Sequence, residues 1–360
     1  MRRQGRSRVP LVVFLGFAVL GFFIFRLVFG IMPGLPTLPP NCTKSNIFCA
    51  GLVTAFGGVD DHASNQSAWE GLQQAKNEGM ADWVAYIESI DSRDYGANIA
   101  AFADAGYDVI VTVGYNLGDA TLAAADEYPG VYFIGIDQFQ AALRANLAGL
   151  VFPEDQAGFL AGALATQMTR TDRIGAVCVS DVVSAYWRYC EGYRAGAGYV
   201  NPLVSVEVMY HEDVNLDTAF ADNEWGAAKA SAMIDEGADV IFGAGGAAGE
   251  GALVAAAQRG VYVIGAETDV YYTLPEAQDM LLTSAVKLSA SGILALLGLA
   301  QEDQADRGNF TGGNYVGEIG YAPYHDLENQ VPAEVKAKME AILLGLKSGR
   351  IQTGVTPEKQ

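Results

Sequence analysis

The sequence predicts an α/β protein with two lobes, each built on a parallel sheet. Apolar runs typical of buried strands alternate with helical patterns beyond residue 46, and such alternation indicates parallel strands joined by helices. One strand–helix–strand pattern occurs twice, over residues 106–137 and 239–269. Both copies end in a strand that leads to an acid, Asp137 in the first and Glu267 in the second. Because parallel sheets bind ligands beyond the carboxyl ends of their strands, the repeat predicts facing lobes around one ligand.

The first lobe follows an N-terminal segment. Strands are predicted near residues 49–54, 83–89, 109–113 and 131–136, with helices near 67–78 and after Arg93. Runs such as VIVTV and VYFIGI lack polar alternation, which is typical of strands covered by helices on both faces. We expect this lobe to comprise residues 46–140 and 284–312.

The second lobe repeats the plan, beginning with a helix near Glu154. The next elements are strands near 173–179 and 203–210, a helix through Tyr199, a helix near 227–236, and the second copy of the repeat. A strand and helix over 281–300 and a strand within 313–325 remain after both sheets are built, which is typical of chain crossings between lobes. We expect this lobe to comprise residues 141–283 and 313–356.

The net charge argues against nucleic-acid binding, and the repeat argues against a nucleotide cofactor. The net charge is −20, with 22 Lys and Arg against 42 Asp and Glu, and nucleic-acid binding needs basic patches. Gly243, Gly245 and Ala248 satisfy the dinucleotide motif G-x-G-x-x-A. The upstream copy of the repeat has no such glycines, so we predict that the shared unit binds no nucleotide cofactor.

The N-terminus predicts export. Basic residues precede an apolar run from Val9 to Phe25, and Arg26 follows it. The run is long for a signal-peptide core and lacks an A-x-A site, which favours an uncleaved anchor within residues 1–45. The domain would then lie outside the cell membrane and the basic end inside. A cleaved signal peptide and a lipid-modified Cys42 are the alternatives.

Four cysteines on the exported side permit disulfides. Local spacing favours the pairs Cys42–Cys49 and Cys178–Cys190. Four buried free thiols are the alternative, because a chain of this size can fold without disulfides.

A set of segments resembles the basic-membrane-protein (PnrA-like) family of ABC transporter substrate-binding proteins. These segments are GGVDDHASNQSAWEGL, FPEDQAGFLAGALA, IGAVCVSD with YCEGYRAGA, VIFGAGGAAGEGA, VIGAETD and LTSAVK. The resemblance covers about residues 49–324. It implies a type I periplasmic-binding-protein fold with three interlobe crossings, partner permease and ATPase subunits, and a purine nucleoside as the common ligand. We expect a monomer.

Acids at strand ends suit a nucleoside, because a carboxylate accepts hydrogen bonds from both hydroxyls of a ribose diol. The repeat nominates Asp137 and Glu267, and similarity to the family nominates Asp269. Lys287 resembles a family lysine on a crossing strand, where a buried ammonium should meet an acid or a ligand oxygen. Solvated loop carboxylates and a surface lysine are the alternatives.

The loop before the first helix offers polar contacts to a base. Its candidates are Asp60, Asp61, Asn65 and Gln66, for which helix capping is the structural alternative. Ser64 stands where the family tends to have a stacking Phe. On the second lobe, Tyr189 matches a family aromatic and Trp187 lies two residues earlier, so either offers a stacking face.

The glycines at corresponding strand ends, Gly114 and Gly245, are also predicted to face the ligand. With one stacking face missing, a purine nucleoside stays favoured. A flavin-like heterocycle or a small polar solute remain alternatives.

Two other classes of function, a membrane-anchored sensor and an enzyme, fit the sequence less well than solute capture. A membrane-anchored sensor is disfavoured because residues 1–8 are too short for an inner signalling domain. An enzyme is disfavoured because the three histidines have no metal-ligand spacing and no G-x-S-x-G elbow or P-loop is present. We therefore expect no catalytic activity, no cofactor and no metal.

Overall fold

The computed structural model describes residues 42–43, 46–55, 58–61, 63–212, 214–304 and 310–359. The predicted N-terminal anchor lies outside the described residues. Within these ranges, no helix combines the length and apolar character needed to cross a membrane.

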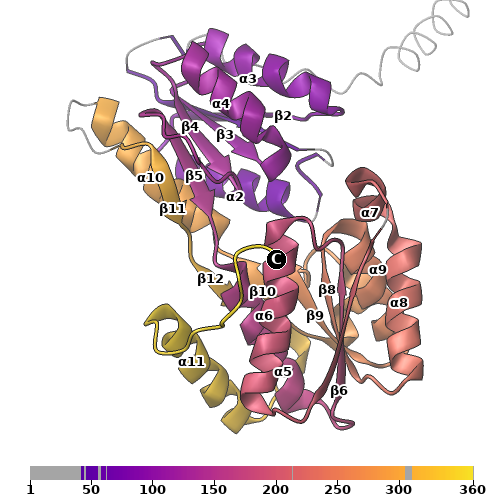
Figure 1. Ribbon diagram of the computed structural model, residues 1–360. Helices are drawn as coiled ribbons and strands as arrows, with labels where there is room; N and C mark the ends of the chain where they lie inside the picture. The colour runs from indigo at the N-terminus through magenta and orange to yellow at the C-terminus, as the bar shows by residue number, and fades with distance from the viewer. Residues whose placement is uncertain are drawn as a thin grey trace, which may run out of the picture. The chain divides into compact units, whose positions relative to one another are not determined.

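The first lobe is built on a parallel sheet that has six strands within the described residues, in the order β11-β5-β4-β3-β1-β2. Helices cover both of its faces (Figure 1). The strands are β1 (Cys49–Val53), β2 (Trp83–Ile87), β3 (Val109–Val113), β4 (Tyr132–Ile136), β5 (Leu147–Val151) and β11 (Gly313–Val316). The helices are α2 (Ser64–Asn77), α3 (Tyr95–Asp104), α4 (Gly118–Glu127) and α10 (Ser289–Gln304).

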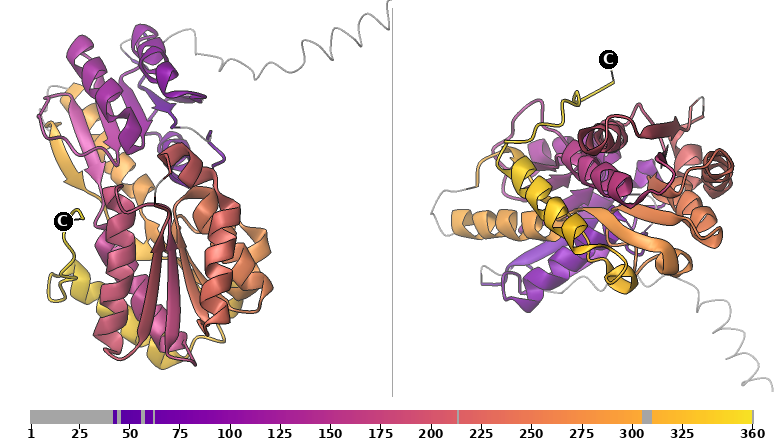
Figure 2. Two further views of the ribbon diagram at one scale, coloured as in Figure 1. Left: turned by 45° about the vertical axis from the view of Figure 1, so that its right-hand side comes forward. Right: turned by 90° about the horizontal axis from the view of Figure 1, so that it is seen from below.

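The second lobe has the same plan, with a described six-stranded sheet in the order β12-β10-β9-β8-β6-β7. Only β12 pairs antiparallel in the described sheet. Its strands are β6 (Arg173–Cys178), β7 (Ser205–Tyr210), β8 (Val240–Ala244), β9 (Tyr262–Glu267), β10 (Leu281–Lys287) and β12 (Ile319–Tyr321). Its helices are α5 (Glu154–Met168), α6 (Ser184–Val200), α7 (Leu216–Ala221), α8 (Asn223–Asp235), α9 (Gly246–Gln258) and α11 (Ala333–Lys347). Figure 2 shows these helices flanking the strands from two further directions.

Three segments of the described chain cross between the lobes. They follow β5, β10 and β11, at residues 152–153, 288 and 317–318. The crossings are hydrogen-bonded side by side, since Gly317 N donates to Val151 O over 2.7 Å and Leu288 N to Glu318 O over 2.9 Å. The crossings therefore form one hinge region.

The crossing points differ from the expected boundaries at 140, 284 and 313. Residues 147–151 extend the first sheet, because β5 pairs in parallel with β4. All of β10 stays in the second sheet, and β11 adds to the first. These short strands carry no signal of the sheet they join, because an apolar run predicts a buried strand and not its partner.

Helices α5 and α6 of the second lobe pack closely against each other, and α5 begins directly after the first crossing. A Cβ on Gly158 would lie 1.9 Å from the Tyr189 carbonyl oxygen, so only glycine permits this approach. Disulfides join Cys178 of β6 to Cys190 of α6, and Cys42 to Cys49. The start of α6 is therefore held to both its neighbouring helix and its sheet.

Candidate functional site

The two acids of the repeat lie at corresponding strand ends. Asp137 follows β4 and Glu267 ends β9, and both have a left-handed backbone, with φ of 59° and 70°. For a residue with a side chain this conformation costs roughly 1–2 kcal/mol. Such strain is typical of functional sites, where the surrounding structure holds it.

Lys287 joins these acids across the lobe junction. Its Nζ lies 3.0 Å from both carboxylate oxygens of Asp137 and 4.0 Å from Oε1 of Glu267. A third carboxylate, that of Glu154, has its Oε1 3.4 Å away. The lysine side chain is only 2% exposed, so these acids replace the water that its ammonium would need. One cation therefore holds acids from both lobes.

Burial and charge act in opposite directions on these groups. Burial raises the pKa of Glu267, while Lys287 and a hydrogen bond from Tyr186 oppose that rise. Burial alone would lower the pKa of Lys287, but attraction by Asp137, Glu154 and Glu267 outweighs it, so its pKa lies well above the ordinary value. Lys287 is therefore a fixed positive charge.

Glu154 and Arg188 belong to this cluster, although sequence reasoning did not assign them. Arg188 Nη2 lies 2.7 Å from Oε2 of Glu154 and its Nε donates to the same oxygen over 2.8 Å. The signal available in the sequence was a pair of acids, Glu154 and Asp155, in the first turn of a predicted helix whose later residues are mostly apolar. The partners of Glu154 lie 34 and 133 residues away, so spacing could not name them.

The two expected stacking residues lie at different depths. Tyr189 is fully buried, and its hydroxyl donates to Ala285 O over 3.3 Å. Its ring lies beneath the lysine, 5.9 Å from Nζ. Trp187 packs on Tyr210 of edge strand β7, which is separated from β9 by two strands, β8 and β6. Neither ring meets the acids as an open face in this structure.

Tyr186 is an aromatic side chain at the site that sequence reasoning missed. It bonds to Glu267, is half-buried, and its ring packs edge-on against Phe220 with centroids 5.3 Å apart. Helical periodicity was the available signal, because Tyr186 lies three residues before Tyr189 and shares its face of α6, whereas Trp187 lies only two residues before it.

The loop before α2 uses part of its polar set for structure. Asp61 accepts hydrogen bonds from the backbone N–H groups of Ala63, Asn65 and Gln66, at 2.9–3.2 Å. The side chain of Asn65 is buried and accepts from Ala55 N over 3.1 Å. The charge of Asp61 also contributes to raising the pKa of Glu267.

The other two loop candidates are more exposed. Gln66 donates to Glu70 over 3.0 Å on the outer face of α2, and Asp60 is exposed. The structure thus brings Asp61 toward the acids and leaves Asp60 and Gln66 at the surface.

Asp269 contacts a histidine of the second lobe. Its Oδ2 lies 2.8 Å from Nε2 of His325, whose ring stacks on Tyr271 with centroids 3.9 Å apart. A ligand that used Asp269 would have to share it with this histidine.

The predicted glycines lie at the strand ends, and both have positive φ. Gly114 has φ of 95° and Gly245 has φ of 104°. A Cβ on Gly245 would lie 2.2 Å from Val179 Cγ1 and 3.2 Å from the Tyr186 ring. Gly245 therefore permits Tyr186 to approach Glu267.

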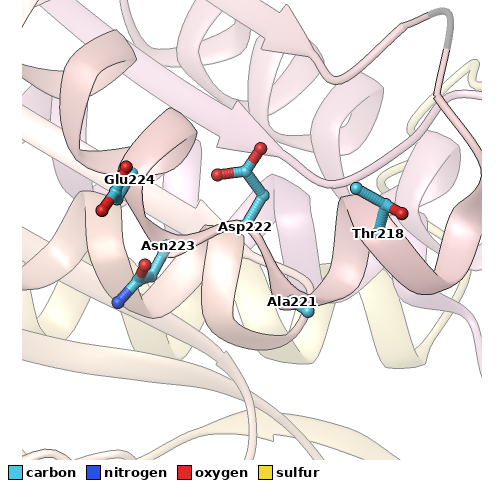
Figure 3. A pocket seen from close by; sticks show the side chains of 5 residues that line it. All are labelled: Thr218, Ala221, Asp222, Asn223 and Glu224. Carbon is cyan, nitrogen blue, oxygen red and sulfur yellow. The ribbon is translucent and has the colours of Figure 1, made fainter.

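A separate surface hollow lies where α7 meets α8. Thr218, Ala221, Asp222, Asn223 and Glu224 line it (Figure 3). Asp222 there accepts from Trp225 N over 2.9 Å and pairs with His211 at 3.1 Å. None of its lining residues belongs to the acid–lysine cluster, so this hollow is not the site predicted by the repeat.

Two helix-covered, mainly parallel sheets, three adjacent crossings and facing acids at the strand ends define a type I periplasmic binding protein. An ABC transporter solute-binding protein from Aeropyrum pernix has a TM-score of 0.70 at 21% identity, covering 87% of this chain and 94% of that one. A periplasmic solute-binding protein from Actinobacillus succinogenes, solved with D-allose, has a TM-score of 0.59 at 12% identity, covering 78% and 99%. At such identities the likeness shows the fold alone.

The chain belongs to the PnrA-like family of ABC transporter substrate-binding proteins, which matches residues 49–312. The "CD4+ T-cell-stimulating antigen" of Listeria monocytogenes is 31% identical over 344 residues, 88% of this chain and 90% of that protein. The "ABC transporter nucleoside-binding protein BmpA" of Lactococcus lactis is 31% identical over 284 residues, 74% and 77% of the two chains. The family predicted from the sequence is confirmed, and with it the fold and the role of substrate-binding protein.

Proposed function

We propose that this protein captures a nucleoside-like solute, with a purine nucleoside favoured, between its lobes for an ABC importer. The observation that carries the proposal is the cluster in which Lys287 joins Asp137 of one lobe to Glu267 of the other. A buried cluster that spans both lobes at their strand ends is where a ligand of this fold would be held.

The chemistry of the cluster suits a ribose. Asp137 and Glu267 offer carboxylate oxygens to the two hydroxyl donors of a diol, and Lys287 donates to a hydroxyl oxygen. Hydrogen bonds to charged groups contribute about 1.5–3 kcal/mol each, so removing one should be measurable. The strained backbones of both acids fit this role, since strain marks positions held for function.

A flat base needs an apolar face beside the diol site. Tyr186 and Phe220 provide aromatic surface on the second lobe, next to Glu267. Asp61 faces them from the first lobe and offers a polar contact to a base edge. The name of the Lactococcus lactis relative, a nucleoside-binding protein, agrees with this class of ligand.

The remaining features follow from the role. We propose a monomer outside the membrane, held by the apolar segment at residues 9–25, that delivers its ligand to permease and ATPase subunits. It carries out no catalysis. Gly114 and Gly245 would lie against the ligand, and Asp60, Asn65, Gln66, Trp187, Tyr189 and Asp269 remain candidate contacts or supports.

The test is calorimetry of the exported part with adenosine, guanosine and inosine, alongside native mass spectrometry of freshly purified protein. We expect saturable binding by the wild type and a loss of at least about tenfold in affinity for Lys287→Met, because one charged hydrogen bond is removed. Asp235→Asn is the matched control, since Asp235 forms an exposed pair with Arg259 in the same lobe.

Absence of binding at millimolar nucleoside would overturn the ligand class and leave the family role standing. A retained mass that matches a flavin or a small polar solute would replace the nucleoside. The search for another retained ligand is needed because Ser64 leaves one face of the base site without an aromatic side chain.

A further inference from the structure

Glu154 differs from the other acids of the cluster in its surroundings. Its side chain is 1% exposed, and each of its oxygens is held by a different cation. Oε1 lies 3.4 Å from Lys287 Nζ, and Oε2 lies 2.7 Å from Arg188 Nη2. Arg188 is itself held by the chain terminus, because its Nη1 donates to Pro357 O over 3.1 Å. Glu154 is therefore fixed between two cations, one beside each of its oxygens.

Glu154 also lies at the hinge. It begins α5 directly after the first crossing, and Lys287 ends β10 directly before the second. The ion pair between them thus joins two of the hinge segments on the side of the second lobe. Phe152, within the first crossing, adds a ring 5.6 Å from Nζ, which closes one side of the ammonium to water.

The three carboxylates around Lys287 cannot all have the same task. If Asp137 and Glu267 turn lone pairs toward a diol, their hold on Nζ weakens at the moment when the lysine must point at the ligand. A buried ammonium without a fixed counter-ion is costly. Glu154 is the carboxylate placed to supply that counter-ion in both the free and the bound protein.

We propose that Glu154 is a positioning residue, which holds Lys287 charged and aimed at the ligand while Asp137 and Glu267 bind it. The proposal rests on the proposed function for its ligand, and extends the site to Arg188, which holds Glu154. No ligand contact is assigned to Glu154 itself.

The first test compares affinity with stability. Glu154→Gln keeps the size of the side chain and removes its charge, and we expect nucleoside affinity to fall about tenfold or more. In Glu154→Gln/Arg188→Gln the unpaired guanidinium is also gone, so stability should recover in part while affinity stays low. Joint recovery of both quantities would show a merely structural role. Asp235→Asn is again the control.

The pH dependence of nucleoside affinity distinguishes an electrostatic role of Glu154 from a packing role, because a packing role would leave it unchanged. The charged or titratable groups that face Lys287 are Asp137, Glu154, Glu267 and Tyr189. With Glu154 neutral, the lysine loses one of three carboxylates that favour its charged form. The affinity of Glu154→Gln should therefore decline at a lower alkaline pH than that of the wild type. Identical profiles would overturn the proposal.

A ligand-free cycle separates this proposal from the proposed function. Unfolding is measured for the wild type, Glu154→Gln, Lys287→Met and the double variant. We expect non-additivity of about tenfold or more in the unfolding equilibrium constant, because contacting charges couple. Additive effects would overturn the positioning role even if nucleosides bind. Coupling would support the hold of Glu154 on Lys287 whichever ligand binds, and the affinity and pH tests then decide whether that hold serves the ligand.

Discussion

At Glu267 both the backbone and the side chain are held in unfavourable states. The backbone is left-handed, and the carboxylate is buried at 4.0 Å from Lys287, the longest of that lysine's three pairs. Asp137 and Glu154 already lie closer to the same ammonium. A third carboxylate therefore adds more repulsion and desolvation than attraction in the free protein, which agrees with its raised pKa.

Glu267→Gln should consequently stabilise the ligand-free protein and weaken ligand binding. We expect a gain of about 0.5–2 kcal/mol in the free energy of unfolding at pH 7. A carboxyl whose folded pKa is raised contributes stability fully below its ordinary value of 4.5, and loses that contribution as pH rises through the folded pKa. The advantage of the variant should therefore disappear on acidification. Urea unfolding at pH 4, 5.5 and 7 checks this, and a variant that is less stable at pH 7 would contradict it.

Ser64 opens α2 where a stacking ring would complete the base site. An aromatic pair contributes about 0.5–1.5 kcal/mol beyond its buried area. Ser64→Phe should therefore tighten purine nucleosides by roughly 2- to 13-fold. Calorimetry with guanosine measures this, with ribose alone as the control because it offers no base to stack. Loss of binding in the variant would show that other residues wall the pocket.

Some of these residues were predictable and others were not. Asp137 and Glu267 follow from the repeat, because corresponding strand ends meet a shared ligand. Lys287 follows from family resemblance. Glu154 and Arg188 were missed because their pairing depends on the close approach of α5 and α6, and no local spacing encodes that geometry. Tyr186 was not predicted, because only Tyr189 matches a family aromatic and Trp187 was its nearest aromatic neighbour in the sequence.

At the scale of elements, most predicted strands and helices are present, but β5, α7 and α11 were not predicted. The single strand expected within residues 313–325 is two strands, β11 and β12, in different sheets. The sheet that each short strand joins does not follow from sequence. β5 and β11 illustrate the reason. Both are short segments beside crossings, and their placement depends on pairing with β4 and with each other. Burial is a property of the run, but strand order is a property of the whole fold.

The C-terminal segment is an element that the family match does not cover. It contacts α5, α6 and the loop before α6 through three bonds: Thr353 to Asp155, Arg188 to Pro357 O, and Lys359 to Asp181. Figure 1 shows this yellow segment passing from α11 to α6. It therefore supports Arg188 and, through it, Glu154.

Removing residues 353–360 should weaken the second lobe without unfolding it. Three polar contacts of about 0.5–1.5 kcal/mol each are lost, and two of them are partly exposed, so we expect a decrease of about 1–3 kcal/mol in the free energy of unfolding. Lys359→Ala alone should leave it nearly unchanged, because water screens the exposed amine. Chemical denaturation of both variants measures the difference. An unchanged denaturation midpoint for the truncated protein would show that the segment lies on the surface without stabilising the lobe.

For the whole molecule, the position of the cluster determines how a ligand can move the lobes. Lys287 and Glu154 flank the crossings on the second lobe, and Asp137 ends a strand of the first, so the contact between Lys287 and Asp137 lies close to the hinge. Contacts near a hinge change little during rotation, whereas contacts farther from it are made only on closure. Ligand should therefore draw the lobes together by hinge rotation.

Small-angle scattering of the exported part should show a smaller radius of gyration with saturating nucleoside. Glu154→Gln separates affinity from closure, because it leaves both lobe surfaces intact. It should need about tenfold more ligand and then reach the same final radius. A lower final extent of closure in this variant would mean that the Glu154–Lys287 pair acts in the hinge motion itself, and an unchanged radius in saturated wild type would place the ligand away from the lobe junction.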